Sequence, residues 1–185
     1  LPGTEVMTDL PELSDPQRRV LGATYENLRI LNLYVPNGAT VGSDKYDYKL
    51  NWLKHLHNHV KESLARYPRL IMLGDFNIAP TDQDVYDPAR WVGEVLVSPP
   101  ERAALQGLLS LGLHDTFRLF EQAIDSFTWW DYRAAAFRRN HGVRIDLILA
   151  STVLTSCCTT CIIDKQLRGL ERPSDHAPVV ATFDG

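Results

Sequence analysis

The sequence lacks several features that would define a class of protein at once. No apolar run approaches the ~18 residues that cross a bilayer, and the first residues carry no charged-then-apolar signal pattern. There is also no Walker loop and no G-x-S-x-G elbow. Nucleotide-driven and serine-hydrolase chemistry is therefore unsupported, and we expect a protein that no membrane holds.

Cysteine and net positive charge are also scarce. The sequence has three cysteines, Cys157, Cys158 and Cys161, all in one segment. An odd number of cysteines indicates reduced thiols in a cytosolic setting. Cys158 and Cys161 form a C-x-x-C, but no second pair or nearby histidine completes a zinc set. The net charge of −4 argues against a protein that holds nucleic acid through bulk positive charge. It leaves open a local basic groove, or one completed by metal ions.

The composition is that of an ordinary globular domain, with 185 residues of which 44% are hydrophobic and 23% charged. Residues 18–24 and 28–35 predict two strands of a hairpin. From Asp44 to about Arg66, apolar positions recur every three or four residues, which predicts an amphipathic helix. The helix should end at Tyr67, because the residue before a proline disfavours helical geometry.

The remaining chain mixes strands and helices. Residues 70–74 predict a buried strand, and Ser98 with Glu101 forms a capping box that opens a helix through about Leu111. Further strands are predicted at residues 126–132, 144–151, 156–164 and 178–183. Because hairpins and crossovers are both present, the sequence predicts an α/β sandwich of sheets covered by helices.

Polar side chains follow the buried strand at residues 70–74. Asp75 and Asn77 lie at its C-terminal end, where α/β folds tend to place their sites. A carboxylate there can bind a divalent cation or take a proton from water, and a carboxamide can contact a phosphate oxygen or the metal. The alternative is an Asx turn that ends the strand.

Asp146 is a second acidic candidate, because it stands between Ile145 and Leu147 in an apolar strand. A charge in such a strand is costly unless it is paired or belongs to a site. The alternative is a pair with nearby Arg144.

The third candidate is the sequence Ser174-Asp175-His176, just before the last predicted strand. Neighbours in an extended chain diverge, so we expect His176 to take Asp146 as its partner and Asp175 to face a cation. A simple turn is the alternative. Taken together, one histidine, three aspartates and an asparagine at strand ends suggest Mg²⁺-assisted attack of water on a phosphate ester.

Aromatic and basic residues precede Asp146. One of Trp129 and Trp130 should point away from the core, where it could stack on a base or a sugar. Residues 133–144 hold the densest group of arginines in the chain. Beside a phosphate site they favour phosphate contact over a solvated loop.

Six motifs together resemble the exonuclease III family of apurinic/apyrimidinic (AP) endonucleases, part of the wider endonuclease/exonuclease/phosphatase superfamily. They occur in the order LNLYVPNG, LIMLGDFNIAPTDQDV, LGLHDTFRLF, SFTWWDYR, RIDLILAS and RPSDHAPVVATF. G-D-x-N and S-D-H-x-P are shared across the superfamily, whereas RIDLILAS and FTWWDYR belong to the DNA-repair branch. The resemblance covers about residues 18–183.

The resemblance implies a four-layer α/β sandwich and a role for each candidate. Asp75 would activate the attacking water and Asn77 would stabilise the charge on phosphorus. His176, held by Asp146, would contact the scissile phosphate, with Tyr34 near it or the leaving oxygen. The metal, Mg²⁺ or Mn²⁺, would be held by Asp75, Asn77 and Asp175. The substrate would be held by Trp129 and Ile145 as walls of a sugar pocket, and by Asn37, Arg144 and nearby arginines on the DNA backbone.

The implied activity is Mg²⁺-dependent cleavage 5′ of abasic sites and removal of nucleotides from 3′ ends of duplex DNA. An extrahelical, base-free sugar suits an apolar pocket, whereas normal paired bases are too costly to extrude. The resemblance also implies a monomer in the bacterial cytoplasm or nucleoid, with double-stranded DNA as its partner.

The sequence departs from the family pattern at its start. The family begins with a strand that carries an asparagine and a second strand whose L-Q-E-T-K-like end supplies a metal-binding glutamate, and neither is present. We therefore expect residues 1–185 to be a single catalytic domain that lacks the first strands of the family fold. Exposed apolar sheet edges should follow, and the isolated chain should be inactive or nearly so.

Two other functions remain open. One is a superfamily phosphatase or phosphodiesterase that acts on small phosphoesters such as lipid or inositol head groups, although Trp129 and RIDLILAS argue against it. The other is a non-catalytic DNA-binding fragment that has kept the site residues.

Overall fold

The computed structural model describes residues 2–13 and 15–184. These residues form two sheets, a larger one with the strand order β1-β2-β3-β4-β6-β5 and a smaller one that pairs β7 with β8. Within the larger sheet β3 and β4 run parallel, and the other neighbours run antiparallel. The strands are β1 (Thr4–Met7), β2 (Val20–Tyr25), β3 (Leu28–Tyr34), β4 (Leu70–Asp75), β5 (Leu113–Asp115), β6 (Asp146–Ser151), β7 (Cys158–Ile163) and β8 (Val179–Phe183).

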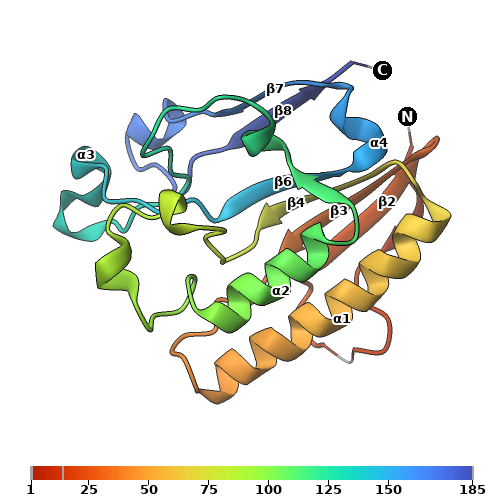
Figure 1. The fold of residues 1–185 in the computed structure, drawn as a ribbon, viewed down its shortest axis with the longest axis horizontal. Helices are drawn as coiled ribbons and strands as arrows, with labels where there is room; N and C mark the ends of the chain where they lie inside the picture. Colours follow the sequence, from red (N-terminus) through yellow and green to blue (C-terminus); the bar gives the residue numbers. More distant parts are fainter. Residues whose placement is uncertain (1, 14, 185) are drawn as a thin grey trace.

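The two sheets and the helices form layers. In Figure 1, α1 (Asp44–Arg66) and α2 (Pro99–Leu109) lie below the larger sheet, and β7 and β8 lie above it. α3 (Ala136–Arg139) and α4 (Thr152–Thr155) are single turns on the periphery. The predicted α/β sandwich of sheets covered by helices is confirmed.

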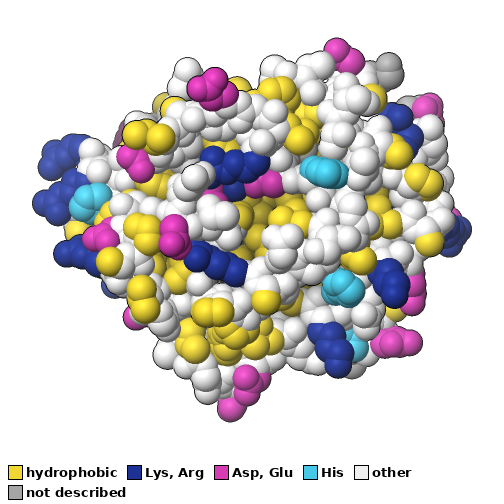
Figure 2. All heavy atoms as spheres, viewed as in Figure 1, with side chains coloured by type: hydrophobic (Ala, Val, Ile, Leu, Met, Phe, Trp, Pro, Cys, Tyr) yellow, Lys and Arg dark blue, Asp and Glu magenta, His cyan; other side chains and the backbone are white. Residues whose placement is uncertain are grey.

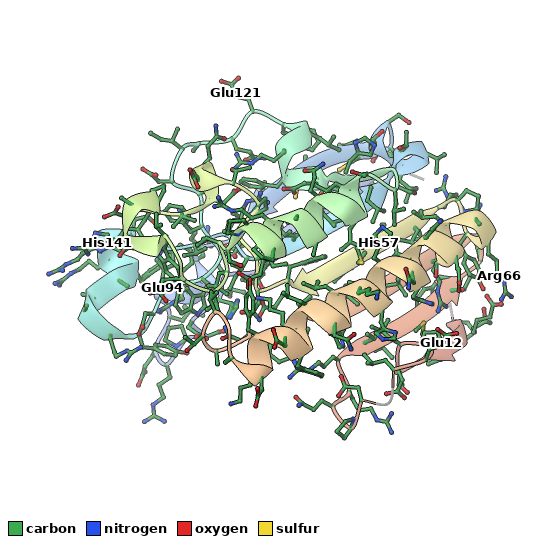
Figure 3. All side chains as sticks on the ribbon, turned by 60° about the horizontal axis from the view of Figure 1, so that its bottom comes forward. Glu12, His57, Arg66, Glu94, Glu121 and His141 are labelled. Atoms are coloured by element: carbon green, nitrogen blue, oxygen red, sulfur yellow. The ribbon has the colours of Figure 1, made fainter. Side chains whose placement is uncertain are left out.

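The two long helices pack against each other. Figure 3 shows His57 between them, and a side chain built at Gly107 of α2 would meet the His57 ring at 3.6 Å. α1 begins at its N-cap Ser43, whose hydroxyl accepts a hydrogen bond from the Tyr46 amide, and it ends before Tyr67 as predicted. No helix in the described part of the chain has both the length and the apolar content to cross a membrane.

The core lies between the helices and the larger sheet. Leu31, Met72 and Leu149 stand opposite one another on β3, β4 and β6, and all three are fully buried. They pack in one cluster with Trp52 and Leu56 of α1. Because side chains alternate along a strand, positions an odd number of residues from this row point to the other face, toward β7 and β8.

Most of the predicted elements are confirmed. β2 and β3 form the expected hairpin, and α2 carries the expected capping box of Ser98 and Glu101. The strand predicted at residues 126–132 is wrong, because this segment makes only isolated bridges at Trp129 with Val143 and His176. Since its partners come from two separate loops, no continuous ladder forms. The short strands β1 and β5 had no sequence signal.

Candidate active site

Three candidate residues form a row across the larger sheet. Asp75 of β4 stands opposite Tyr34 of β3 on one side and opposite Asp146 of β6 on the other. Residues directly opposite one another project from the same face of a sheet. Each lies three positions from the buried row of Leu31 and Met72, so the three side chains point away from the helices. The sheet itself therefore assembles this group.

A glycine allows β4 to deliver Asp75. Gly74 has φ +131°, a conformation that side chains rarely adopt, and a Cβ built there would lie 2.0 Å from the carbonyl oxygen of Leu33. Only a residue without a side chain lets the two parallel strands approach so closely at this position. Gly74 thus fixes the backbone immediately before the proposed base.

Asn77 locks the Asp75 carboxylate in place. Its backbone amide donates to Oδ1 of Asp75 at 2.8 Å, and its side-chain Nδ2 donates to Oδ2 at 2.9 Å. The same Nδ2 also donates to the Val35 carbonyl, and Oδ1 of Asn77 accepts from Nδ2 of Asn37 at 3.1 Å. The Asx turn weighed as an alternative is present, and it is what orients Asp75.

His176 is joined to Asp146, as the sequence predicted. Nδ1 of His176 lies 2.8 Å from Oδ2 of Asp146, so the imidazole donates to the carboxylate and its Nε2 stays available. Thr128 places Asp146 in turn, because its hydroxyl accepts from the backbone amides of Ile145 and Asp146. Thr128 was not a candidate from the sequence, where a threonine beside two tryptophans gives no signal of such a role.

Asp175 and His176 are held by the segment around Trp129. The Trp130 amide donates to the Asp175 carbonyl, and the indole Nε1 of Trp129 donates to Oδ2 of Asp175 at 3.0 Å. Trp130 is fully buried, whereas Trp129 is only partly buried. The prediction that one of the two tryptophans points away from the core is met only in part, because Trp129 still packs against the buried residues Val143 and Ile145.

The electrostatics of the site suit proton transfer near neutral pH. Burial, followed by repulsion from Asp146, raises the pKa of Asp75 to about 6. Burial alone would lower the pKa of His176, but its hydrogen bond to Asp146 and the charges of Asp146, Asp75 and Asp175 raise it above the ordinary value. A buried carboxyl with a strongly raised pKa beside an imidazole paired to a second carboxylate is typical of functional sites.

A cavity of about 350 Å³ opens beside these groups. His176 and Asp146 form its polar side, and Leu73, Ile148 and Val179 form part of its apolar side. On the other side of the row, the guanidinium of Arg19 stacks 4.9 Å from the ring centre of Tyr34, which is 52% exposed. The row is therefore open to solvent at Tyr34 and bordered by an apolar hollow at Asp146.

Arg144 corrects the sequence interpretation. It is only 1% exposed, and its guanidinium binds Asp84 and Asp115 at 2.7 Å each, so it is not free to hold a DNA backbone. The alternative pair with Asp146 is also wrong, because Arg144 binds these two other carboxylates and Asp146 binds His176. Ile145 is 2% exposed and packs beside Trp129, so of the two predicted pocket walls only Trp129 offers appreciable surface.

Oxygen donors for a divalent cation are present, although the ligand set is sparse. Among the described residues, no three acidic, histidine or cysteine side chains come together as a metal cluster. Asp75, Asn77 and Asp175 offer oxygen atoms, which Mg²⁺ and Mn²⁺ prefer. Mg²⁺ commonly keeps several waters and binds through one or two carboxylates plus substrate phosphates. The donor chemistry therefore fits such a cation.

Lys49 is a residue of the site that the sequence interpretation missed. Its side chain is fully buried in α1, and its Nζ donates to the backbone carbonyls of Asn37 and Asn77. A signal was available, because Lys49 occupies the apolar stripe of the helix between Tyr46 and Leu53. A lysine on the buried, apolar side of a helix almost always has a charged or hydrogen-bonding partner.

Positive charge gathers at one end of the molecule. Figure 2 shows Lys and Arg side chains together at the end where α3 lies in Figure 1. Arg138 and Arg139 of α3 are exposed, as is Arg90. A chain of net charge −4 therefore still carries a local basic surface.

The fold and this site define a class of protein. A carboxylate with a raised pKa at the end of the interior strand β4, and an imidazole oriented by a carboxylate at the start of β6, are the groups of a hydrolase that activates water. The family model described as Endonuclease/Exonuclease/phosphatase matches residues 2–176.

Individual relatives agree with this class. Exodeoxyribonuclease III of Haemophilus influenzae is 35% identical, and the match covers 91% of this chain and 68% of the relative. The structure of the 3′ phosphatase NExo from Neisseria bound to a product DNA hairpin is 43% identical, with a TM-score of 0.96 over 99% of this chain and 72% of that one. An AP endonuclease of Archaeoglobus fulgidus is 33% identical, with a TM-score of 0.94 over 100% and 72% of the two chains.

The chain therefore belongs to the endonuclease/exonuclease/phosphatase family, in its exonuclease III branch of AP endonucleases. It is a hydrolase of the nuclease type, as the resemblance of its motifs implied.

Proposed function

We propose that this protein is a DNA-repair phosphodiesterase that cleaves duplex DNA 5′ of abasic sites and removes nucleotides from 3′ ends with Mg²⁺. The observation that carries the proposal is the row of Tyr34, Asp75 and Asp146 on one face of the sheet, with His176 bound to Asp146. Membership in a family of nucleases supports DNA as the substrate.

The proposed chemistry is direct attack of water on phosphorus. Asp75 takes a proton from the water, whose oxygen forms a bond to phosphorus as the ester bond to the 3′ oxygen breaks. Tyr34, beside Asp75 and exposed, supplies a proton to the departing oxygen. The His176 imidazole contacts a phosphate oxygen, and Asp146 keeps it in position and favours its charged form.

The role of Asn77 follows from its hydrogen bonds. The resemblance implies that it stabilises charge on phosphorus, yet both hydrogens of its Nδ2 already have partners, the Val35 carbonyl and Asp75. The geometry supports orientation of the base by Asn77. A contact with phosphorus would require Asn77 to release one of these partners.

A divalent cation would be held by oxygens of Asp75, Asn77 and Asp175. When bound, it would neutralise phosphate charge and acidify bound water. Mg²⁺ is the proposed ion and Mn²⁺ its substitute. The roles of Trp129 beside the sugar and of Asn37 on the backbone stay proposals of the same kind, as do a single catalytic domain, a monomeric state and a cytoplasmic location.

A 3′-terminal phosphate is a second candidate substrate. The solved structure from Neisseria at 43% identity is named as a 3′ phosphatase and holds a DNA hairpin product. The same water attack would release inorganic phosphate from a DNA 3′ end. Both substrates place one phosphate at a 3′ oxygen, so the same row of residues can serve both.

The test compares four substrates with the purified chain and its Asp75→Asn variant. They are a duplex with one abasic site, a duplex with a recessed 3′ end, a 3′-phosphate hairpin and a small aryl phosphate. We expect slow but measurable Mg²⁺-dependent turnover of one or more DNA substrates, lost in the variant and in EDTA. Turnover of the aryl phosphate alone would favour a small-molecule phosphatase.

The same assay addresses the remaining expectations. If the wild type and the Asp75→Asn variant both bind DNA, and neither cleaves it with any divalent metal, a non-catalytic DNA-binding protein would be favoured. Rapid nicking of abasic duplex by the 185 residues alone, their intact mass confirmed, would contradict the expectation that they are nearly inactive.

A further inference from the structure

A buried lysine links the two long helices to the proposed catalytic loops. Lys49 of α1 is 0% exposed, and its Nζ lies 3.1 Å from the carbonyl oxygen of Asn37 and 2.7 Å from that of Asn77. Its third partner is Oε1 of Glu101, which is also 0% exposed. An ammonium group has three hydrogens to donate, and all three have acceptors here.

The two carbonyl acceptors belong to the loops that carry the site. Asn37 follows β3 and Asn77 follows β4, and their side chains are joined to each other and to Asp75 by hydrogen bonds. Asn77 holds φ +48°, a left-handed conformation that needs support from its surroundings. Lys49 is the group that ties both backbones to one point.

Glu101 completes the arrangement from α2. Its Oε1 accepts from Lys49 and the Leu96 amide, and its Oε2 accepts from the amide and hydroxyl of Ser98 at the start of α2. The charge of the lysine is therefore balanced by a carboxylate that is itself fixed. Buried charges are retained when paired and hydrogen-bonded in this way.

We propose that Lys49 is a positioning residue of the catalytic site, which sets the distance between the Asn37 and Asn77 loops and through Asn77 the orientation of Asp75. The space around it is tight, because a side chain built at Gly38 would meet Cδ of Lys49 at 3.1 Å. A displacement of Lys49 would therefore shift the loop at Asn37 as well as the backbone at Asn77.

A purely structural role for the ion pair is the competing explanation, and one double variant separates the two. Lys49→Met with Glu101→Gln removes both charges, and the glutamine oxygen still accepts from the amide and hydroxyl of Ser98, while the Leu96 amide loses its acceptor. Buried ion pairs can often be replaced by neutral groups with little loss of stability. The two asparagine carbonyls nevertheless lose their shared donor.

The experiment measures the site with and without catalysis. In nitrogen-15 spectra of the wild type we expect a slowly exchanging side-chain amide at Asn77, and in the double variant a shifted signal that exchanges at least about tenfold faster. On the best DNA substrate, the single-turnover rate should fall roughly 100-fold. The DNA dissociation constant should change less than about threefold.

Leu56→Ala is the matched control, because Leu56 is fully buried on α1 about two helical turns beyond Lys49 and has no polar side-chain atom to bind the asparagine carbonyls. It should lower the melting temperature, yet leave the Asn77 amide and the turnover rate unchanged at a temperature where the protein is folded. Unchanged Asn77 signals and an undiminished rate in a folded double variant would overturn the proposal. The measurement of the turnover rate rests on the proposed function, whereas the measurement of amide exchange at Asn77 does not. A wild type without turnover would count against that function alone.

Discussion

Asp75 sits in surroundings that favour its neutral form, because burial and Asp146 raise its pKa to about 6 from 3.8. As a base it must be ionised, so we expect kcat/KM to rise with pH through about 6. His176 must be charged to contact phosphate, so activity should fall again as pH passes its raised pKa. A bell-shaped pH profile of kcat/KM measures both limbs. A profile flat from pH 5 to 8 would contradict these two roles.

The raised pKa of Asp75 also has a consequence for stability. A carboxyl whose folded pKa exceeds its unfolded value stabilises the fold below the unfolded pKa, and this contribution is lost as pH rises through the folded one. Asp75→Asn should therefore make the protein about 2–3 kcal/mol more stable at pH 7.5 in EDTA, and change little near pH 3.5. Urea unfolding at the two pH values measures this difference. If Asp75→Asn changed the free energy of unfolding equally at both pH values, burial of the Asp75 charge would not destabilise the fold.

The pair of His176 and Asp146 allows a separate prediction. Asp146→Asn removes the carboxylate that orients the ring and raises its pKa. We expect the single-turnover rate to fall roughly 10²- to 10⁴-fold and the basic limb of the pH profile to move to lower pH. An unmoved limb would mean that a group other than His176 sets it.

At the scale of the element, Gly74 decides whether β3 and β4 can pair beside the site. Gly74→Ala should cost about 3 kcal/mol or more, because it adds the clash with the Leu33 carbonyl to the strain of a positive φ. Gly93→Ala is the matched control, since Gly93 also has positive φ (+82°) but open space around it. It should cost about 1–2 kcal/mol. Similar losses of stability in urea for the two variants would disprove the close approach.

The strands and helices that carry strong local signals could be predicted from the sequence. The period of α1, the capping box at Ser98 and the apolar run of β4 each specify their element through nearby residues. The segment at residues 126–132 could not be placed, because its composition fits a strand while its partners are two loops distant in sequence. Which side chains bind one another likewise depends on contacts between residues far apart in the sequence.

The candidate site divides in the same way. Asp75, Asn77, Asp146 and His176 stand at strand ends within recognisable motifs, and the pair of His176 with Asp146 could be anticipated because neighbouring residues diverge. Arg144 was misassigned, since nothing local indicates that Asp84 and Asp115 lie beside it. Lys49 and Thr128 were missed because their partners come from other elements.

At the scale of the whole molecule, basic residues gather at the α3 end while the net charge is −4. We expect the DNA affinity of Arg138→Ala/Arg139→Ala to depend less steeply on salt, with a slope smaller by about 2. Lys54→Ala, an exposed charge on α1, should leave the slope unchanged. The opposite pattern would place DNA over the helices instead.

Arg144→Met adds a test of the buried network. It should cost about 3–5 kcal/mol of stability because Asp84 loses a buried partner. At a temperature where the variant is folded, the salt slope of DNA binding should match the wild type. A slope smaller by about 1 would restore Arg144 as a phosphate contact.

The row of Tyr34, Asp75 and Asp146 has a consequence for how the sequence can change over time. Side chains alternate along a strand, so one residue inserted between Met72 and Asp75 would turn Asp75 toward the helix-facing core while Met72 keeps its place there. Insertion or deletion of a single residue in β3, β4 or β6 would therefore remove a site residue from its face of the sheet. In the loop between β4 and α2, the largely exposed residues 88–94 bear no such constraint. Variation in length among functional descendants should therefore accumulate there and avoid the three strands.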